Sequence, residues 1–450
     1  MARQRIRVRL TPPLARRVGA LALAALAVAG CSSGSRSKSS ATSSTTGAVA
    51  STTPAATNTN TAAPLTSNTL PTNAGTFSAG PDLINARGQH SATLLDDGRV
   101  LVVGGADGSG TLAESEVFDP LTTTWQRTRD LVANPNDGLM LDATGQFPTA
   151  RQLHAALRLD DANKRVLIAG GVGIERLDAQ GQPVFEVLRS SYAFDPTTNT
   201  FSAVADLPAA RVWHLSGVTP AGEPILAGGL DANLTSTSSV AVFDPTNDTW
   251  ATSAMQDLHS WGASVTLSNR VLAISGGDVA QGNNGNLGVA SMSTQRVESI
   301  GAGGAVTPGP DNGADLIFAS ATALPGDGVL LAGGQLLTNN QFTVTDQTEV
   351  FDPASGTWSA GSPLDTARYQ HQALAVGNRG EVLIVGGVDS AGQALTRCEL
   401  FVSGAPVGTS DLAIPRVDHR VVLLQNGQAL VVGGFDAQTQ AIAQTELYTR

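Results

Sequence analysis

The chain has 450 residues, of which 49 are glycine, while aromatic residues make up 4% and charged residues 14%. Its formal net charge of −11 argues against nucleic acid or an anionic membrane surface as a partner, because both attract basic proteins. Cys31 and Cys398 are the only cysteines, which excludes a disulfide-rich scaffold, so stability must come from packing.

The N-terminus has the features of an export signal. An apolar run of twelve residues, Val18–Ala29, follows six arginines and is too short to span a bilayer. It ends in Val28-Ala29-Gly30-Cys31, which looks like a bacterial lipobox. The resemblance implies cleavage before Cys31 and lipidation of its sulfur. Residues 1–30 are therefore predicted to be a lipoprotein signal peptide, and the mature protein is expected to be exported and anchored to a bacterial membrane, either the outer membrane or the cell surface. The alternative is an ordinary signal peptide followed by a chance cysteine.

A segment rich in Ser, Thr and Ala follows, over residues 31–75. Such a composition cannot bury a core, so we expect a disordered tether. Its reach is roughly 35–40 Å on the flexible-chain estimate. Removal of residues 1–30 takes away six arginines and no acid, which leaves 21 basic and 38 acidic side chains and a formal charge of −17.

Seven Gly-Gly doublets, each at the end of a short apolar run, divide the remainder of the chain. Their spacings run from 47 to 66 residues, which indicates an internal structural repeat. The doublets are Gly104-Gly105, Gly170-Gly171, Gly228-Gly229, Gly276-Gly277, Gly333-Gly334, Gly386-Gly387 and Gly433-Gly434.

Each doublet lies within a longer pattern that predicts four strands, here called a to d from first to last. Strand a follows an Arg-x-x-His segment, strand b is the apolar run before Gly-Gly, strand c ends in Phe-Asp-Pro, and strand d opens with Thr and an aromatic residue. Tight turns such as Asp97-Gly98 and Asn426-Gly427 indicate a–b hairpins. The pattern resembles the kelch repeat, which implies an all-β, seven-bladed β-propeller over residues 76–450. Blades four and six lack Phe-Asp-Pro, so their outer strands are expected to be irregular.

The two ends of the repeat region complement each other. Thr76-Phe77 has the form of a strand d with no strand c before it, and residues 446–450 read as a strand c with no strand d after it. We therefore predict that residues 76–80 pair with about 444–448, so that the N-terminal strand joins the C-terminal blade and removes an open sheet edge.

Loop lengths favour one face of the propeller as the functional one. The long segments all fall in d–a or b–c connections, which lie on the same face of an up-and-down blade. Long loops on a rigid scaffold commonly carry binding residues. These segments are 130–148, 172–190, 278–295, 301–315 and 335–346.

All six histidines occur at or near the start of a repeat, one per blade. One histidine per blade cannot converge on a single metal ion, so we expect no metal and buried structural histidines. Five of these repeats carry an arginine three residues earlier, and five guanidiniums around one opening are predicted to bind an anionic ligand. Kelch domains that bind acidic peptides line their pocket in this way. The alternative is that each arginine pairs with a loop acid such as Asp82, Asp365 or Asp411. The five candidates are Arg87, Arg151, Arg211, Arg368 and Arg416.

The sequence favours a binding module over an enzyme. It contains no nucleotide-binding loop, nucleophile elbow or clustered metal motif, and it does not reproduce the copper ligands of galactose oxidase. We expect a monomer with no catalytic residues and no cofactor, which recognises a protein or glycan on the long-loop face. The alternative is an exported enzyme acting on an acidic sugar, similar to kelch-type sialic acid epimerases.

Overall fold

The computed structural model describes residues 75–450 apart from 129–131, 134–139, 142–149, 178–182, 282–286, 293–295, 339–340, 378–379 and 403. The predicted signal peptide, Cys31 and nearly all of the tether lie outside these residues. No helix among the described residues is long and apolar enough to cross a membrane.

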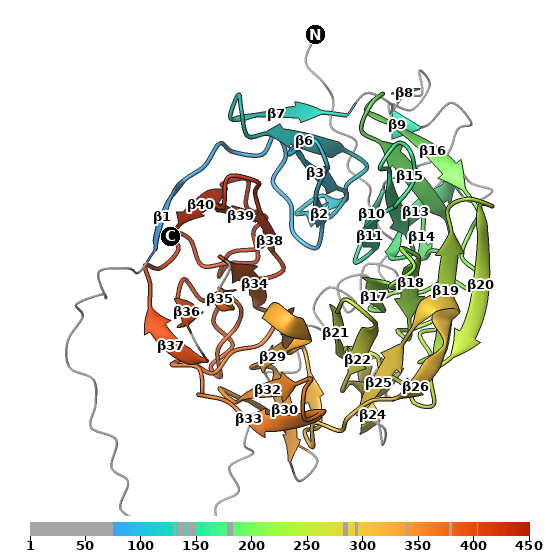
Figure 1. Cartoon of the computed structure of the whole chain (residues 1–450). Coiled ribbons are helices and arrows are strands. Elements are labelled where there is room, and N and C mark those ends of the chain that lie inside the picture. The colour runs from blue at the N-terminus through green and yellow to red at the C-terminus, as the bar shows by residue number, and fades with distance from the viewer. Residues whose placement is uncertain are drawn as a thin grey trace, which may run out of the picture.

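Seven four-stranded antiparallel sheets surround a common axis (Figure 1). The innermost strands contact one another in the order β2, β11, β17, β21, β28, β34, β38 and again β2, so each blade has a neighbour on both sides. The fold is therefore the expected seven-bladed propeller.

Each blade follows the predicted strand order from the axis outward. Blade one is β2 (Ser91–Leu94), β3 (Val100–Val103), β6 (Ser115–Asp119) and β7 (Thr124–Arg127). Blade two is β11 (Ala155–Arg158), β12 (Val166–Ala169), β15 (Ser191–Asp195) and β16 (Thr200–Val204). Blade three is β17 (Leu215–Val218), β18 (Pro224–Ala227), β19 (Ser239–Asp244) and β20 (Thr249–Ala254).

The second half of the ring repeats the same order. Blade four is β21 (Ala263–Thr266), β22 (Val271–Ile274), β25 (Val297–Ile300) and β26 (Val306–Pro308). Blade five is β28 (Ser320–Ala323), β29 (Val329–Ala332), β32 (Thr348–Asp352) and β33 (Thr357–Ala360). Blade six is β34 (Gln372–Val376), β35 (Glu381–Val385), β36 (Cys398–Val402) and β37 (Ala405–Gly408). Blade seven is β38 (Arg420–Leu423), β39 (Ala429–Val432), β40 (Glu446–Thr449) and β1 (Thr76–Ala79).

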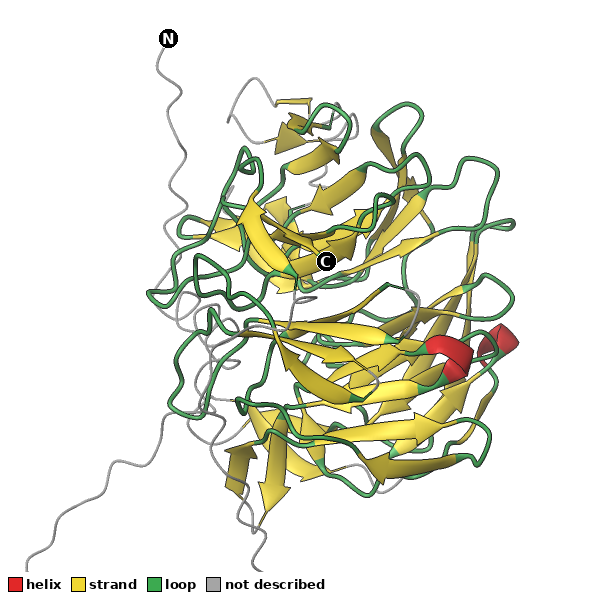
Figure 2. Cartoon of the chain, turned by 60° about the vertical axis from the view of Figure 1, so that its left-hand side comes forward, coloured by secondary structure: helices red, strands yellow, loops and turns green. Residues whose placement is uncertain are grey.

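The only helices in the described part of the chain are two short 3-10 turns, drawn in red in Figure 2. They are η1 (Ala302–Gly304), between the two outer strands of blade four, and η2 (Pro325–Asp327), between the two inner strands of blade five. The outer strand of blade four thus forms without the Phe-Asp-Pro turn, through a 3-10 turn instead.

The first strand closes blade seven as predicted. β1 pairs antiparallel with β40, with Thr76 opposite Thr449 and Ala79 opposite Glu446. The Phe77 and Tyr448 rings lie 5.0 Å apart between centroids. In Figure 1 the blue N-terminal strand lies beside the red C-terminal one.

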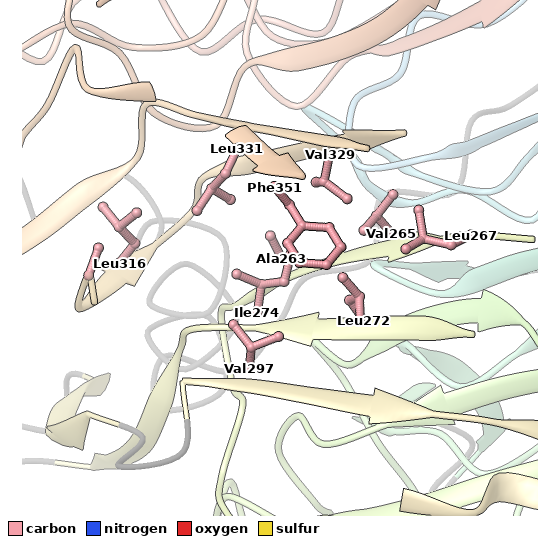
Figure 3. Packing of buried hydrophobic residues seen from close by; sticks show 11 residues of the cluster. Ala263, Val265, Leu267, Leu272, Ile274, Val297, Leu316, Val329, Leu331 and Phe351 are labelled. Atoms are coloured by element: carbon pink, nitrogen blue, oxygen red, sulfur yellow. The ribbon is translucent and has the colours of Figure 1, made fainter. Parts of the chain in front are cut away.

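Apolar side chains between the blades form the core. Strand b is buried on both faces in every blade, as in β29, because each blade is packed between two others. Figure 3 shows Phe351 of blade five pointing toward Leu272 and Ile274 of blade four. Complete burial of one such side chain stabilises the fold by about 1.5–3 kcal/mol.

The glycine doublets join neighbouring blades. A Cβ atom on Gly333 would lie 2.5 Å from the carbonyl oxygen of Arg368 in the next blade. The amide of Gly334 donates a hydrogen bond to that same oxygen at 2.8 Å. Both glycines have positive φ, of 59° and 100°, which is strained for other residues. Gly333 therefore permits the close approach of the next blade, and Gly334 permits that of Ile317 and Ala319 in its own blade.

Candidate functional site

The d–a and b–c connections lie on one face, as predicted, because they pair with each other. In blade two β10 (Arg151–Gln152) pairs with β13 (Val172–Leu177), and in blade five β27 (Leu316–Ile317) pairs with β30 (Gln335–Thr338). We call this the d–a/b–c face. Functional side chains from several blades can therefore meet on it.

Three of the predicted long loops are hairpins on this face. They are β13 with β14 (Pro183–Val187), β23 (Gly277–Gln281) with β24 (Leu287–Met292), and β30 with β31 (Gln341–Val344). Blade one carries a shorter one, β4 (Ala106–Asp107) with β5 (Gly110–Thr111). Segment 301–315 is not a long loop, since it contains η1 and the outer strand β26. Segment 130–148 falls mostly outside the described residues, which include only β8 (Val132–Ala133) and its partner β9 (Met140–Leu141) there.

The five arginines lie inside the blades rather than around the opening, which corrects the sequence-based expectation. Each is at most 1% exposed. In blade seven, Nη1 of Arg416 donates to the carbonyls of Gly433 and Gln444 at 2.9 and 3.0 Å, and Nη2 donates to Glu446 at 2.7 Å. The guanidinium thus fastens strand b to strand c within one blade. Arg87, Arg151, Arg211 and Arg368 make the corresponding bonds to two carbonyl oxygens in their own blades.

In three blades the acidic partner is a glutamate on strand c, not one of the loop aspartates Asp82, Asp365 and Asp411. Arg87 pairs with Glu116 and Arg368 with Glu399, both at 2.6 Å, as Arg416 pairs with Glu446. Blades two and three use the hydroxyls of Ser190 and Ser239 instead. In blade four His259 stands at the arginine position and contacts Glu298 at 2.9 Å. No described guanidinium of this set remains free for a ligand.

The substitution Arg416→Ala is expected to reduce the free energy of unfolding by about 3–5 kcal/mol, because it leaves Glu446 buried without its cation. Urea denaturation measures this loss. Arg397→Ala is the matched control, since Arg397 is 40% exposed and lies 3.4 Å from an exposed Asp365. The Arg397→Ala variant is expected to lose about 1 kcal/mol or less of its free energy of unfolding. An Arg416 variant as stable as the wild type but deficient in binding anions would restore the ligand hypothesis.

The histidines that follow the arginines are buried between blades, as expected. A Cβ atom on Gly333 of blade five would lie 2.9 Å from the ring of His371 in blade six. The His371 ring nitrogen Nε2 lies 2.7 Å from the Ser320 hydroxyl of blade five. Burial, followed by the charge of Arg368, lowers the pKa of His371 to about 3. The imidazole is therefore neutral and structural.

The residue immediately before each of these histidines, or before its counterpart in blades four and five, forms a ring around the axis. All seven have φ between 52° and 60°, in the left-handed region. Backbone hydrogen bonds join several neighbours, including Leu153 N to Gln89 O at 3.1 Å and Gln89 N to Asp418 O at 3.0 Å. We call these seven residues the collar. They are Gln89, Leu153, Trp213, Trp261, Phe318, Gln370 and Asp418.

One side of the collar, from blade two to blade five, is apolar and largely aromatic. The Trp213 and Trp261 rings meet edge to face with centroids 6.0 Å apart, and Trp261 and Phe318 lie 5.1 Å apart at 31°. Trp213, Phe318 and Leu153 are half-buried. Apolar residues of the hairpins on the d–a/b–c face, including Phe185, pack against the same cluster. We call this side the aromatic arc.

The other side of the collar is polar and comprises Gln370, Asp418 and Gln89. The Gln89 side-chain amide donates to the Asp418 carboxylate at 2.9 Å. Burial raises the pKa of Asp418, although this hydrogen bond and the charge of Arg420 act in the opposite direction. Arg420 differs from the five blade arginines, because its guanidinium donates to the carbonyl of His419 and has no ion-pair partner among the described residues. We call this side the polar arc.

Sequence reasoning missed the collar. The repeat pattern drew attention to the Arg and His of each segment. The collar residue is instead the variable one immediately before the His. Its variability within an otherwise regular repeat was the available signal. The left-handed backbone conformation that places it there involves a single residue in each blade, and these residues share no type that would reveal it in the sequence.

Comparisons with known proteins agree with the fold. No model of a known protein family matches the chain. The mouse, rat and human forms of Kelch-like protein 15 are 29% identical to it over 167 residues, which are 36% of this chain. The matched region spans 25% of those relatives' length.

Two solved structures resemble the propeller. The structure of YjhT has a TM-score of 0.51 at 15% identity and covers 74% of this chain and 99% of its own. A fungal alcohol oxidase of the AA5 family, in complex with copper, has a TM-score of 0.55 at 14% identity and covers 84% of this chain and 76% of its own. At these identities the likeness shows the fold alone. The chain therefore has the fold of a kelch-type β-propeller.

The described residues contain no group of three or more His, Cys, Asp and Glu side chains that could hold a metal ion. Cys398 is fully buried on strand c of blade six. Burial raises the pKa of its thiol to about 12.

We expect Cys398 in the native protein to react very slowly with a disulfide reagent at neutral pH, because the thiolate is the reactive form. The Cys31→Ala variant isolates this one thiol. Unfolding in urea should release it, and the rate of thiol colour development with and without urea measures the difference. Equal rates in the two conditions would contradict this burial.

Proposed function

We propose that this protein is a recognition module that binds a protein or glycan ligand at the collar, on the d–a/b–c face. The observation that carries the proposal is the collar itself, in which aromatic side chains, two of them half-buried, and polar side chains are brought together around the propeller axis from seven blades. Apolar lining with a few convergent polar groups is the usual composition of ligand sites. The blade arginines leave no cationic ring for the ligand, because they are used within the blades.

We further propose that Cys31 carries a lipid that anchors the module to the bacterial envelope. Thr76 pairs with Thr449, at the end of β40 that lies away from the b–c loop. Thr76 therefore lies at the end of blade seven opposite the d–a/b–c face, so an anchor at Cys31 would favour a collar that faces away from the membrane. Cys31→Ala is expected to lose lipid label and to leave the membrane fraction, because one acylated residue supplies the whole anchor. Unchanged membrane association after a salt wash would contradict the anchor.

A binding experiment on the full chain tests the recognition proposal. Neutral oligosaccharides, N-acetylneuraminic acid and envelope peptides are titrated by calorimetry, and saturable binding of any of them supports a recognition module. Weaker binding of that ligand after substitution of a collar residue assigns the site to the collar. Absence of binding across the panel and across an envelope extract contradicts the proposal.

The second candidate is an enzyme acting on an acidic sugar. It is favoured by Arg420, a half-buried cation without an ion-pair partner among the described residues, two residues from Asp418 in the chain. Conversion of N-acetylneuraminic acid between its anomers, followed by NMR, distinguishes it from a binder. Acceleration that depends on Arg420 and Asp418 supports the enzyme, whereas saturable binding without acceleration supports the module.

A further inference from the structure

We propose that the ligand of the collar is a neutral glycan, with one pyranose ring packed on the aromatic arc and its hydroxyls bonded to the polar arc. This inference rests on the proposed function and narrows its ligand from protein or glycan to glycan. The combination of aromatic side chains with buried, unpaired donors and acceptors around the propeller axis carries it.

The aromatic arc supplies a surface suited to a flat, weakly polar ring. Trp213, Trp261 and Phe318 follow one another on blades three, four and five with centroid separations of 5.1–6.0 Å. An aromatic face carries negative partial charge and attracts the C–H bonds on the face of a pyranose. Trp213 and Phe318 are half-buried in the free protein, so part of their surface remains to be covered. Left-handed backbone alone does not mark the site, because all seven blades have it.

The polar groups at the collar need a partner that both donates and accepts. Four polar atoms there are buried without a hydrogen-bond partner in the described chain: Gln89 Oε1 and Gln370 Oε1, which accept, Trp261 Nε1, which donates, and the Tyr369 hydroxyl, which does both. Tyr369 lies beside the arc, 6.4 Å from Phe318. Gln89 and Trp261 are each 3% exposed, and Tyr369 is 0% exposed.

Hydroxyl groups match this mixture because each one both donates and accepts. A carboxylate alone would leave both amide oxygens unmatched, because it only accepts hydrogen bonds. Charge complementarity points the same way. Among the seven collar residues Asp418 is the one ionisable group, and the charge of Arg420 beside it offsets the carboxylate, so this part of the polar arc carries little net charge and suits a neutral sugar.

Calorimetric titration of the full chain with cellohexaose, maltohexaose and chitohexaose tests the proposal. We expect at least one to bind saturably and Trp213→Ala to weaken it by about tenfold or more, as for a central aromatic contact. Gln370→Leu is expected to weaken binding of the same sugar, because it removes a hydrogen-bonding group of the polar arc. Trp250→Ala is the matched control, since this half-buried tryptophan lies on the outer strand β20 and its Nε1 donates to Ala205. Far-UV circular dichroism and melting temperature check that each variant is folded.

Each outcome decides the matter. Equal binding by the Trp213 and Trp250 variants, both folded, overturns the site. If none of the three sugars binds at millimolar concentration and an envelope peptide binds saturably in a way that depends on Trp213, the glycan proposal is wrong and the recognition module stands. If sugars, sialic acid and peptides all fail to bind the wild-type protein, the proposal of a recognition module is wrong as well.

Discussion

Deletion of residues 75–82 is expected to destabilise the propeller by more than about 5 kcal/mol, because it removes the outer strand of blade seven and the contacts that seal the ring. The lost contacts include the β1–β40 ladder and the Phe77–Tyr448 ring pair. The amide of Phe77 also donates to the Ser410 hydroxyl at 2.8 Å, which joins the first strand to the end of blade six. The measurement is the urea midpoint together with the melting temperature.

Deletion of an equal length from the Ser/Thr-rich segment, residues 55–62, is the control and is expected to leave both quantities unchanged. A synthetic peptide of residues 75–82 added to the shortened protein should restore part of the loss, because an exposed edge accepts an added strand. If the shortened protein melts like the full chain, the first strand is not needed for closure.

The sequence predicts the fold well because its signals are local and repeated. Each Gly-Gly doublet marks a place where only glycine fits, as the Gly333 contact with the Arg368 carbonyl illustrates. Cross-strand aromatic pairs such as Phe118–Trp125 and Phe351–Trp358, at 5.1 and 5.3 Å, explain why the strand c and strand d signals recur together. Seven repetitions of one pattern leave little freedom in the architecture.

The role of the arginines could not be predicted in the same way. The repeat places Arg416 correctly at the start of the innermost strand, but its side chain runs back into its own blade toward Glu446. The direction of a long side chain depends on which acid lies within reach, and Glu446 is 30 residues away in the chain. A glutamate two residues before the aromatic residue of strand c, as Glu446 is before Tyr448, was hardly distinguishable in the sequence from other acids. Burial of both partners is what makes the pair structural.

Stability is expected to fall steeply as the pH is lowered from about 6.5 toward 4.5. Burial lowers the pKa of five histidines in the folded protein, to about 3 for His214 and His371 and in the same direction for His90, His154 and His419. In the unfolded chain their pKa returns to about 6.5. Between these values the unfolded state binds more protons, so the free energy of unfolding decreases as the pH falls.

Other groups modify this slope without reversing it. Burial raises the pKa of Glu349, Glu399 and Asp418, so these carboxyls take up protons earlier in the folded state and oppose the histidines. Each histidine that stays neutral in the folded protein contributes up to about 1.4 kcal/mol per pH unit, and the carboxyls make the net slope smaller than the five histidines alone would give. The surface aspartates with lowered pKa, such as Asp352, add to the loss only below about pH 4.

Urea denaturation at intervals between about pH 7.5 and 4.5 measures the slope, and His371→Gln isolates one contribution. Glutamine keeps a hydrogen-bonding group near the Ser320 hydroxyl but cannot take up a proton. The variant is expected to lose stability at pH 7.5 and to lose about 1.4 kcal/mol less per pH unit than the wild type on acidification. A wild-type midpoint that stays constant over this range would mean that the histidines reach solvent in the folded protein. A slope that is steep in the wild type and unchanged in the variant would instead assign the acid sensitivity to groups other than His371.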